Sequence, residues 1–166
     1  MKFNNDMLRL YAVTDRHWTG EQTLYEQVRS VLMGGATCLQ LREKDLDEAS
    51  FYEEAKNIKE LCRLFDVPFI INDNVMLAKE IDADGVHVGQ DDMACIKARE
   101  ILGPDKIIGV SAHTIEEARI AKEQGADYLG VGAIFPTSSK DDAEVLGIKR
   151  LKEMTETVDL PMVAIG

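Results

Sequence analysis

Residues 36–41, with the sequence ATCLQL, recur in outline at 83–88 as ADGVHV and at 126–131 as ADYLGV. Each copy is a short apolar run led by alanine, which predicts a buried β-strand. From Ala36 to Ala83 is 47 residues and from Ala83 to Ala126 is 43, the length of two strand–helix units. Alternate strands of a closed barrel contribute equivalent interior layers, so this repeat favours a TIM (β/α)8 barrel over an open doubly wound sheet.

Further apolar runs extend the alternation on both sides of the repeat. They predict strands at 10–13, 68–71, 107–110 and 162–165, with helical segments between the strands. Thr19 with Gln22 is expected to cap the first helix, and Gly34-Gly35 to end it. Thr114 followed by Glu117 predicts the start of a later helix. Parallel strands joined by helices make the fold α/β.

The chain length sets a limit on this barrel. All 166 residues are expected to form a single (β/α) barrel domain. The next copy of the repeat would begin about 45 residues beyond Ala126, past Gly166, whereas a complete barrel takes about 250 residues. We therefore expect an apparently truncated barrel that stops after strand seven, without strand eight and its adjoining helices. Apolar strand edges left open in this way could be covered by a partner chain in a homo-oligomer.

Composition excludes several classes of function. The chain is 45% hydrophobic and has 19 Lys and Arg against 30 Asp and Glu, a net charge of −11. This acidic balance argues against binding nucleic acid or anionic membrane through a broad positive field. The polar N-terminus and the lack of a run of about 20 apolar residues predict a cytoplasmic protein. Cys38, Cys62 and Cys95 lack disulfide or zinc spacing and are interpreted as packing residues.

Polar residues gather where the predicted strands end, which is where barrel enzymes carry their chemistry. Gln40, Arg42 and Lys44 are spaced by two and share one face of an extended chain, while Leu41 and Glu43 share the other. Two cations and an amide on one face predict an anion site, and Arg and Lys both suit phosphate. The alternative is a surface ion-pair strip with Glu43 and Asp45.

Two carboxylates follow neighbouring predicted strands. Asp73 and Asp92 suggest a magnesium-bound pyrophosphate in combination with the cationic strip, since Mg²⁺ is commonly held by one or two carboxylates and substrate phosphates. Taken singly, each is typical of a helix cap or turn. Thr137, Ser138, Ser139 and Lys140 form a hydroxyl-rich loop that suits a second phosphate, or an ordinary solvated loop. His87 occupies the repeat position of Gln40 and Gly130, and a hydrogen-bonded core histidine is favoured over direct chemistry.

Five motifs in this order resemble the thiamine-phosphate synthase family. They are QLREK at 40–44, IND at 71–73, GVHVGQDD at 85–92, GVSAHT at 109–114 and PTSSK at 136–140. The resemblance runs from Leu10 to the last residue. It implies a TIM-barrel transferase of thiamine biosynthesis, which joins 4-amino-2-methyl-5-(diphosphooxymethyl)pyrimidine to 4-methyl-5-(2-phosphooxyethyl)thiazole and releases pyrophosphate by a magnesium-assisted dissociative mechanism.

The resemblance also implies roles for individual residues. Arg42, Lys44, Lys140 and Ser111 would be catalytic, and Asp73 and Asp92 would hold Mg²⁺. The substrate-binding set would be Gln40, Leu41, Arg42, Glu43, Lys44, Asn72, Ser111, Thr137, Ser138, Ser139, Lys140 and Gly166. Ser111 would lie by the pyrimidine, and Thr137 to Ser139 would contact the thiazole phosphate.

The resemblance leaves two alternatives open. Family members continue beyond Gly166 to an eighth strand that helps bind thiazole phosphate, so weak binding of that substrate or absent turnover is expected of this chain. A thiazole tautomerase of the same fold would not need the diphosphate and metal residues. A non-catalytic module that binds phosphate ligands is the other alternative.

Overall fold

The computed structural model describes residues 2–90, 93–137 and 145–166. It contains one parallel sheet of seven strands in the order β1-β2-β3-β4-β5-β6-β7, so every strand pairs with its neighbours in the sequence. The strands are β1 (Tyr11–Val13), β2 (Cys38–Leu41), β3 (Phe69–Asn72), β4 (Gly85–Val88), β5 (Ile107–Ala112), β6 (Tyr128–Gly132) and β7 (Met162–Ile165). The predicted barrel order and seven strands are confirmed.

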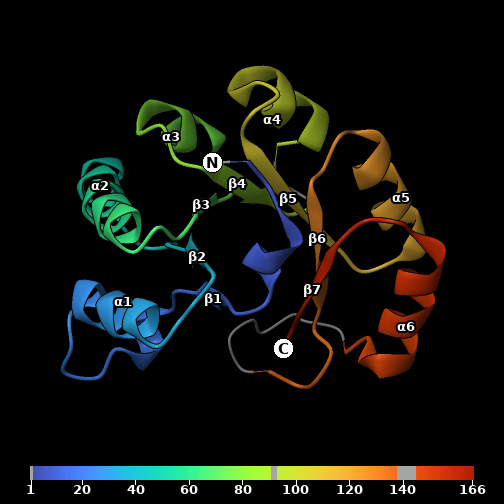
Figure 1. Cartoon of the computed structure of the whole chain (residues 1–166), viewed down its shortest axis with the longest axis horizontal. Coiled ribbons are helices and arrows are strands. Elements are labelled where there is room, and N and C mark those ends of the chain that lie inside the picture. The colour runs from blue at the N-terminus through green and yellow to red at the C-terminus, as the bar shows by residue number, and fades with distance from the viewer. Residues whose placement is uncertain (1, 91–92, 138–144) are drawn as a thin grey trace.

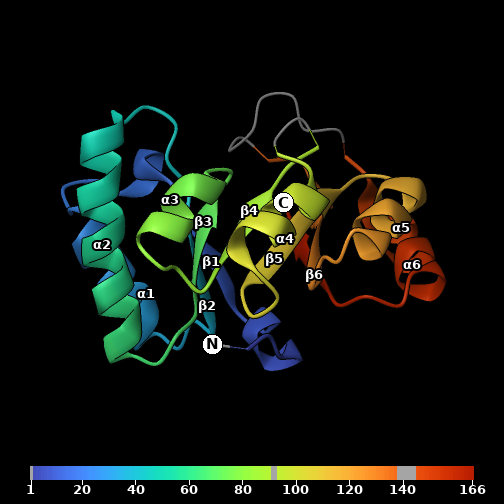
Figure 2. The ribbon, with the colours of Figure 1, turned by 90° about the horizontal axis from the view of Figure 1, so that it is seen from above.

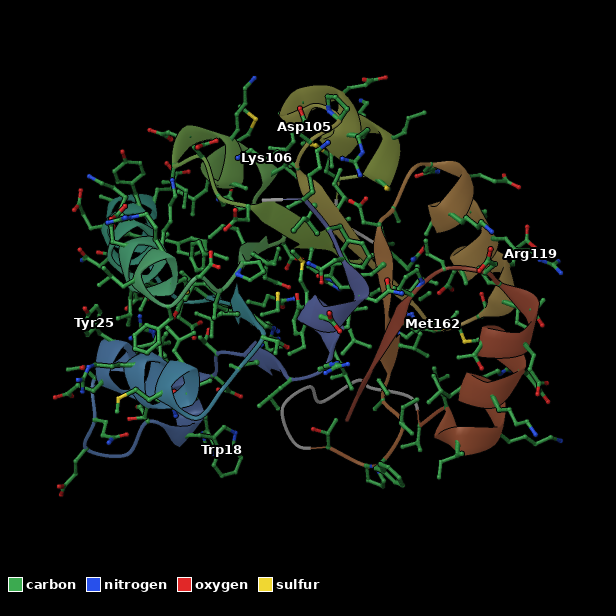
Figure 3. All side chains as sticks on the ribbon, in the orientation of Figure 1. Trp18, Tyr25, Asp105, Lys106, Arg119 and Met162 are labelled. Carbon is green, nitrogen blue, oxygen red and sulfur yellow. The ribbon has the colours of Figure 1, made fainter. Side chains whose placement is uncertain are left out.

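Helices cover the outside of this curved sheet, as Figure 1 shows. They are α1 (Leu24–Met33), α2 (Glu48–Leu64), α3 (Val75–Glu80), α4 (Cys95–Leu102), α5 (Ile115–Glu123) and α6 (Gly147–Thr157), with short 3₁₀ helices η1 (Asn5–Leu8) and η2 (Arg16–Trp18). Side chains such as Tyr25 of α1 and Arg119 of α5 extend outward from this ring of helices (Figure 3). In the described part of the chain, β1 and β7 are the edge strands of the sheet.

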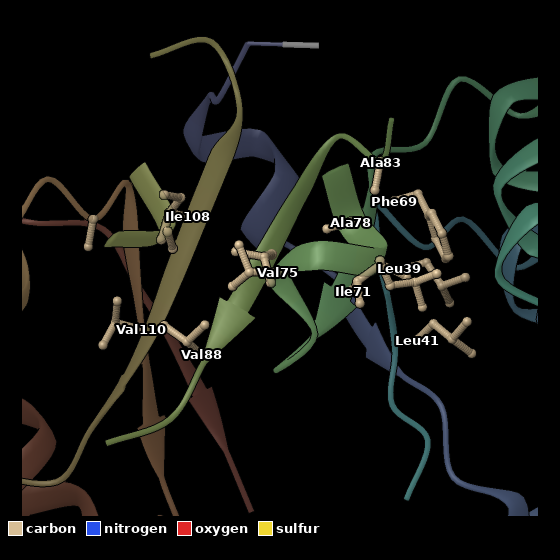
Figure 4. Close-up of a cluster of buried hydrophobic side chains, with 14 of the residues drawn as sticks. Leu39, Leu41, Phe69, Ile71, Val75, Ala78, Ala83, Val88, Ile108 and Val110 are labelled. Atoms are coloured by element: carbon tan, nitrogen blue, oxygen red, sulfur yellow. The ribbon is translucent and has the colours of Figure 1, made fainter. Parts of the chain in front are cut away.

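Two separate apolar clusters hold the two faces of the sheet. The larger cluster lies between strands and helices, where Leu39, Leu41 and Ile71 pack with Val75 and Ala78 of α3 (Figure 4). The smaller cluster fills the interior, with Met7, Cys38, Ile70, Ile107, Tyr128 and Val163. Met7 belongs to η1, which lies against the end of the sheet where the strands begin (Figure 2). The strands are therefore buried on both faces, as their continuous apolar runs predict.

The second residue of each repeat copy explains part of the repeat. Thr37 Oγ1 accepts the Leu10 N–H at 2.8 Å, Asp84 Oδ2 accepts the Phe69 N–H at 3.0 Å, and Asp127 Oδ2 accepts the Ile108 N–H at 2.7 Å. Each side chain thus ties the start of an even strand to the preceding odd strand. The repeat therefore joins the strands at the end of the barrel opposite the predicted site.

The first helix begins later than predicted. Thr23, not Thr19, is its N-cap, and Thr23 and Glu26 form a complete capping box. Thr19 instead ends η2, where its N–H bonds to the Arg16 carbonyl, so Gln22 has no capping role in α1. Two pairs in this segment have the capping spacing of three residues, Thr19 with Gln22 and Thr23 with Glu26. Because Thr19 is the C-cap of η2, only the second pair lies at the start of α1. The predicted stop at Gly34-Gly35 and the cap at Thr114 are confirmed.

Cys38, Cys62 and Cys95 are free and buried, as predicted. Burial raises the pKa of the Cys62 thiol to about 12 and that of Cys95 to about 11, so both remain protonated and serve as packing groups. Within the described residues, no helix combines the length and apolar character that crossing a membrane requires.

Candidate active site

The end of β1 fixes the main chain that follows β2. Thr14 is buried, and its Oγ1 accepts the Arg42 N–H at 2.9 Å and lies 3.4 Å from the Arg42 carbonyl oxygen, to which it donates. The Thr14 N–H bonds to the Gln40 carbonyl at 3.0 Å. The segment from Gln40 to Arg42 therefore leaves the sheet in a fixed direction, with its position set by β1.

We expect Thr14→Val to destabilise the fold by about 1–3 kcal/mol, because it leaves the half-buried Arg42 N–H without its acceptor while keeping side-chain shape. Urea unfolding followed by circular dichroism would measure this loss. Thr155→Val is the matched control, since the Thr155 hydroxyl bonds to the Lys152 carbonyl on the exposed surface of α6. A Thr14→Val protein as stable as the control would show that water or a shifted loop replaces the hydroxyl.

Glu43 faces away from the mouth of the barrel. Its Oε2 accepts a hydrogen bond from Arg16 Nε at 2.9 Å, and Arg16 Nη2 also pairs with Glu54 of α2. The Glu43 side chain is 2% exposed. Burial raises the pKa of the Glu43 carboxyl against the opposing effect of Arg16, and the hydrogen bond to Glu43 raises the pKa of Arg16. This ion pair joins the loops after β1 and β2 to α2.

This pairing argues against the alternative of a surface ion-pair strip. In the described residues, Glu43 pairs with Arg16, and the ion pairs found include neither Arg42 nor Lys44. Leu41 is fully buried on the helix side, so its side chain is not available to a ligand. Arg42 is half-buried and Lys44 exposed. The predicted division of the strip into two faces is confirmed at Gln40, Leu41 and Glu43.

Asp73 lies at the carboxyl end of β3 in a fixed conformation. Its N–H bonds to the His87 carbonyl at 2.8 Å, its φ is 62°, and its Oδ2 accepts from Asn72 Nδ2 at 2.6 Å. The cap of α3 is Asn74, whose side chain accepts the Leu77 N–H at 2.9 Å. Of the two interpretations of Asp73, the helix cap is therefore wrong, and the structure shows a residue in the turn between β3 and α3. Its exposed carboxylate lies at the mouth, directly after the strand that pairs with β2.

Ser111 lies inside β5, because this strand runs two residues further than predicted to pair with β6, with Ser111 opposite Gly130. Its Oγ is 3.0 Å from His87 Nε2, and its carbonyl accepts from Gln90 Nε2 at 2.5 Å. His87 is buried in the interior, as the repeat predicts. Asn72 likewise belongs to β3, opposite His87 of β4.

A chain of polar groups continues from His87 down into the barrel. His87 Nδ1 lies 3.1 Å from Tyr128 Oη, which lies 2.6 Å from Tyr11 Oη, which accepts from Gln40 Nε2 at 2.9 Å. Burial raises the pKa of both tyrosine hydroxyls far above the ordinary value, so both phenols keep their protons. The hydrogen bonds thus link the strip residue Gln40 to Ser111 through the core.

Only some of the remaining predicted site residues lie in the described part of the chain. Asp92, Ser138, Ser139 and Lys140 lie outside the described residues. Thr137 lies after β6 and is exposed. Gly166 follows β7 with φ 96°, and a side chain there would come within 2.7 Å of the Ala133 Cβ. In the described residues, no group of three or more His, Cys, Asp or Glu side chains is placed to hold a metal ion.

Sequence reasoning missed Thr14, Arg16, Tyr11 and Tyr128. Thr14 and Arg16 flank Asp15 directly after the first strand, a position that could have marked them. Asp15 itself caps η2, with Oδ1 accepting the His17 N–H at 2.9 Å. Tyr11 and Tyr128 occupy strand positions that read as ordinary apolar residues, and only the register of the sheet brings their hydroxyls together.

Fold and site define a (β/α)-barrel enzyme with a polar mouth at the carboxyl ends of its strands. The family model described as thiamine monophosphate synthase matches residues 10–166. The chain is 51% identical over 158 residues to the thiamine-phosphate synthase of Clostridium acetobutylicum, covering 95% of this chain and 75% of the relative. It is 48% identical to that of Methanobrevibacter smithii, covering 98% and 78%. The chain therefore belongs to the thiamine-phosphate synthase family and is an enzyme of thiamine biosynthesis.

Solved structures agree with this assignment. The thiamine phosphate pyrophosphorylase of Pyrococcus furiosus superposes with a TM-score of 0.87 at 42% identity, over 98% of this chain and 76% of that one. An N-acetylmannosamine-6-phosphate 2-epimerase of Clostridium perfringens has a TM-score of 0.66 at 15% identity, over 95% and 77%. The second likeness shows the barrel fold alone.

Proposed function

We propose that this enzyme condenses 4-amino-2-methyl-5-(diphosphooxymethyl)pyrimidine with 4-methyl-5-(2-phosphooxyethyl)thiazole to give thiamine phosphate and pyrophosphate. The bond between the pyrimidine methylene carbon and the diphosphate oxygen breaks, and a bond from the thiazole nitrogen to that carbon forms. The carrying observation is that Arg42 and Lys44, without ion pairs to other described residues, follow β2, and that Asp73 follows β3, the strand paired with β2. Two cations beside a carboxylate suit a diphosphate with a divalent cation.

Each polar residue at the mouth has a role in this proposal. Arg42, Lys44 and Lys140 neutralise the departing pyrophosphate, which matters most if it leaves before the nitrogen attacks. Gln40 and Asn72 bind the pyrimidine diphosphate with the main chain of Leu41 and Glu43, since both of these side chains are directed away from the mouth. Ser111 lies by the pyrimidine, and Thr137, Ser138, Ser139 and Gly166 contact the thiazole phosphate. No enzyme nucleophile is needed, because the aminopyrimidine delocalises positive charge at its methylene carbon.

The residues at β3 fit the magnesium ion that the family implies. Asp73 offers an exposed carboxylate whose direction is set by Asn72 Nδ2 and by the His87 carbonyl. Asp92 follows β4, which pairs with β3. Oxygen ligands of this kind suit Mg²⁺, which when bound would shield the charge of the diphosphate. Asp73 and Asp92 would hold the ion, and Asn72 would orient the Asp73 carboxylate.

Substituting Asp92→Ala is expected to lower product formation about a hundredfold, because one metal ligand is lost. The rate of pyrophosphate release at increasing Mg²⁺ concentrations would measure the loss and any shift in metal requirement. Asp105→Ala is the matched control, since this exposed aspartate precedes β5 at the opposite end of the barrel. Near-normal turnover of Asp92→Ala would remove Asp92 from the metal site.

The function itself is tested by incubating the protein with both substrates and Mg²⁺ and measuring thiamine phosphate and pyrophosphate. Formation of both products supports the proposal. Binding of the pyrimidine diphosphate without products would instead indicate a module that binds phosphate ligands, or a synthase that has lost turnover. Isomerisation of thiazole phosphate without diphosphate binding would indicate a tautomerase.

The proposal extends to the organisation of the protein. Residues 1–166 would act as one (β/α) barrel domain in the cytoplasm, with small-molecule substrates as its ligands. Homo-oligomers are a further expectation, because the β1 and β7 edges of the sheet offer backbone groups to a partner. Sedimentation velocity of the purified chain would measure its oligomeric state.

A further inference from the structure

The interior chain of hydrogen bonds has a direction that follows from counting its protons. Gln40 Nε2 donates to Tyr11 Oη. The Tyr11 proton then points to Tyr128 Oη, its other hydrogen-bond partner. Tyr128 in turn donates to His87 Nδ1. With Nδ1 accepting, a neutral His87 carries its proton on Nε2 and donates to Ser111 Oγ.

The opposite direction leaves a proton without an acceptor. If Ser111 donated to His87, then His87 would donate to Tyr128 and Tyr128 to Tyr11. Tyr11 Oη would then accept hydrogen bonds from both Tyr128 and Gln40. The proton of the Tyr11 hydroxyl would have no acceptor, because both of its hydrogen-bond partners would be donors to it. Burial keeps both phenols protonated, so neither can serve as an acceptor only. The amide orientation of Gln40 therefore sets the direction of the whole chain.

We propose that Gln40, Tyr11, Tyr128 and His87 are positioning residues that turn the Ser111 hydroxyl into a hydrogen-bond donor at the mouth of the barrel. This rests on the proposed function, and it assigns Ser111 an unprotonated acceptor on the pyrimidine diphosphate, such as a ring nitrogen lone pair. A serine hydroxyl is too weak an acid to protonate that nitrogen. The ring is thus held while it keeps the electrons that stabilise positive charge at the methylene carbon.

The local packing supports a fixed geometry for this chain. A side chain at Gly109 would come within 2.4 Å of Tyr128 Oη and 2.5 Å of His87 Nδ1, and one at Gly130 within 2.9 Å of His87 Cε1. Phe3 stacks on the Tyr128 ring with centroids 5.9 Å apart. Glycines on β5 and β6 therefore make room for the two rings, and neighbouring groups hold them in place.

The tautomer of His87 tests the direction independently of activity. In ¹⁵N-labelled protein, long-range ¹H–¹⁵N correlation spectra are expected to show a protonated Nε2 and an unprotonated Nδ1 for His87, assigned with His87→Asn. His17, which is exposed, and His113, which is half-buried, provide internal references. A protonated Nδ1, alone or together with Nε2, would overturn the proposal.

A substitution at Gln40 should reverse the direction of the interior hydrogen bonds. In Gln40→Glu, at alkaline pH, an ionised carboxylate can only accept, so Tyr11 would donate to it and His87 would become the Nδ1–H tautomer. Tyr11→Phe should leave the Nε2–H tautomer in place, because Tyr128 still donates to His87. A folded Gln40→Glu protein with unchanged His87 would contradict the role of Gln40, and the wild-type spectrum decides the direction if this variant does not fold.

Kinetics test the link to the substrate. Tyr128→Phe is expected to raise KM for the pyrimidine diphosphate about fivefold, as expected for one lost hydrogen bond in the chain, with a smaller effect on kcat. Tyr25→Phe, on the outer face of α1, is the matched control. Equal KM values for the two variants would show that the interior hydrogen bonds do not contribute to substrate binding. If no thiamine phosphate forms although His87 is the Nε2–H tautomer, the proposed function fails. The direction of the interior hydrogen bonds is still supported in that case.

Discussion

Arg42→Ala should lower kcat/KM for the pyrimidine diphosphate about a thousandfold. The reason is electrostatic, because pyrophosphate gains charge as its bond to carbon breaks, and a guanidinium beside the leaving group stabilises the transition state more than the ground state. Arg42 is suited to this role since Thr14 holds its main chain and other described residues provide no carboxylate partner for it. The measurement is initial-rate kinetics with pyrophosphate detection.

Two further variants make this prediction specific. Arg63→Ala removes an arginine of α2 that is 66% exposed and paired with Glu60 on the helix surface, so its activity should match the wild type. Arg42→Lys keeps the charge and loses the planar fork, which predicts an intermediate loss of about tenfold to a hundredfold. Activity of Arg42→Ala within about twofold of the Arg63→Ala control would exclude Arg42 from the stabilisation of pyrophosphate.

The fold was readable from the sequence because the barrel is specified at every level. The repeat at 36–41, 83–88 and 126–131 marks the even strands, and its polar second positions prove to be side chains that bond to the preceding strand. Alternation of short apolar runs with amphipathic helices identifies the rest. The boundaries were less accurate: β3 and β5 run on into Asn72 and Ala112, because pairing with neighbouring strands continues there.

Part of the site could also be predicted, because an extended chain has a period of two. That period places Gln40 on the opposite face from Leu41, and the structure confirms it. The residues that fix the site, Thr14 and Arg16, act through contacts 28 and 27 residues away in the chain. Such contacts depend on the register between β1 and β2, which no local pattern encodes. The roles of Arg42, Lys44 and Asp73 toward substrate and metal remain predictions.

The interior hydrogen bonds from Gln40 to Ser111 could not be predicted from the sequence, for a different reason. Tyr11 and Tyr128 are 117 residues apart and meet only because both point into the barrel. The rings of Tyr128 and His87 need space that two glycines on neighbouring strands, Gly109 and Gly130, provide. A glycine in a strand usually weakens it, so its presence here indicates close approach of another group.

Gly109→Ala should therefore destabilise the protein by about 3 kcal/mol, a large effect for one added methyl group. The new Cβ would lie 2.2 Å from Tyr128 Cζ and 2.5 Å from His87 Nδ1, and both rings are buried, so neither can move into solvent. Urea unfolding followed by circular dichroism measures the change. Gly34→Ala is the control, because its Cβ would meet only carbonyl oxygens of α1 at 3.3 Å or beyond, and we expect less than about 1 kcal/mol there.

A double-mutant cycle shows whether the steric cause is correct. Tyr128→Ala alone should cost about 4 kcal/mol, since it removes a fully buried ring. Combined with Gly109→Ala it should cost less than the sum, because the space left by the ring receives the added methyl group. Strict additivity would mean that the cost of Gly109→Ala comes from the backbone of β5 and not from the ring of Tyr128. In that case the close packing of Tyr128 and His87 would no longer explain why β5 carries a glycine at this position.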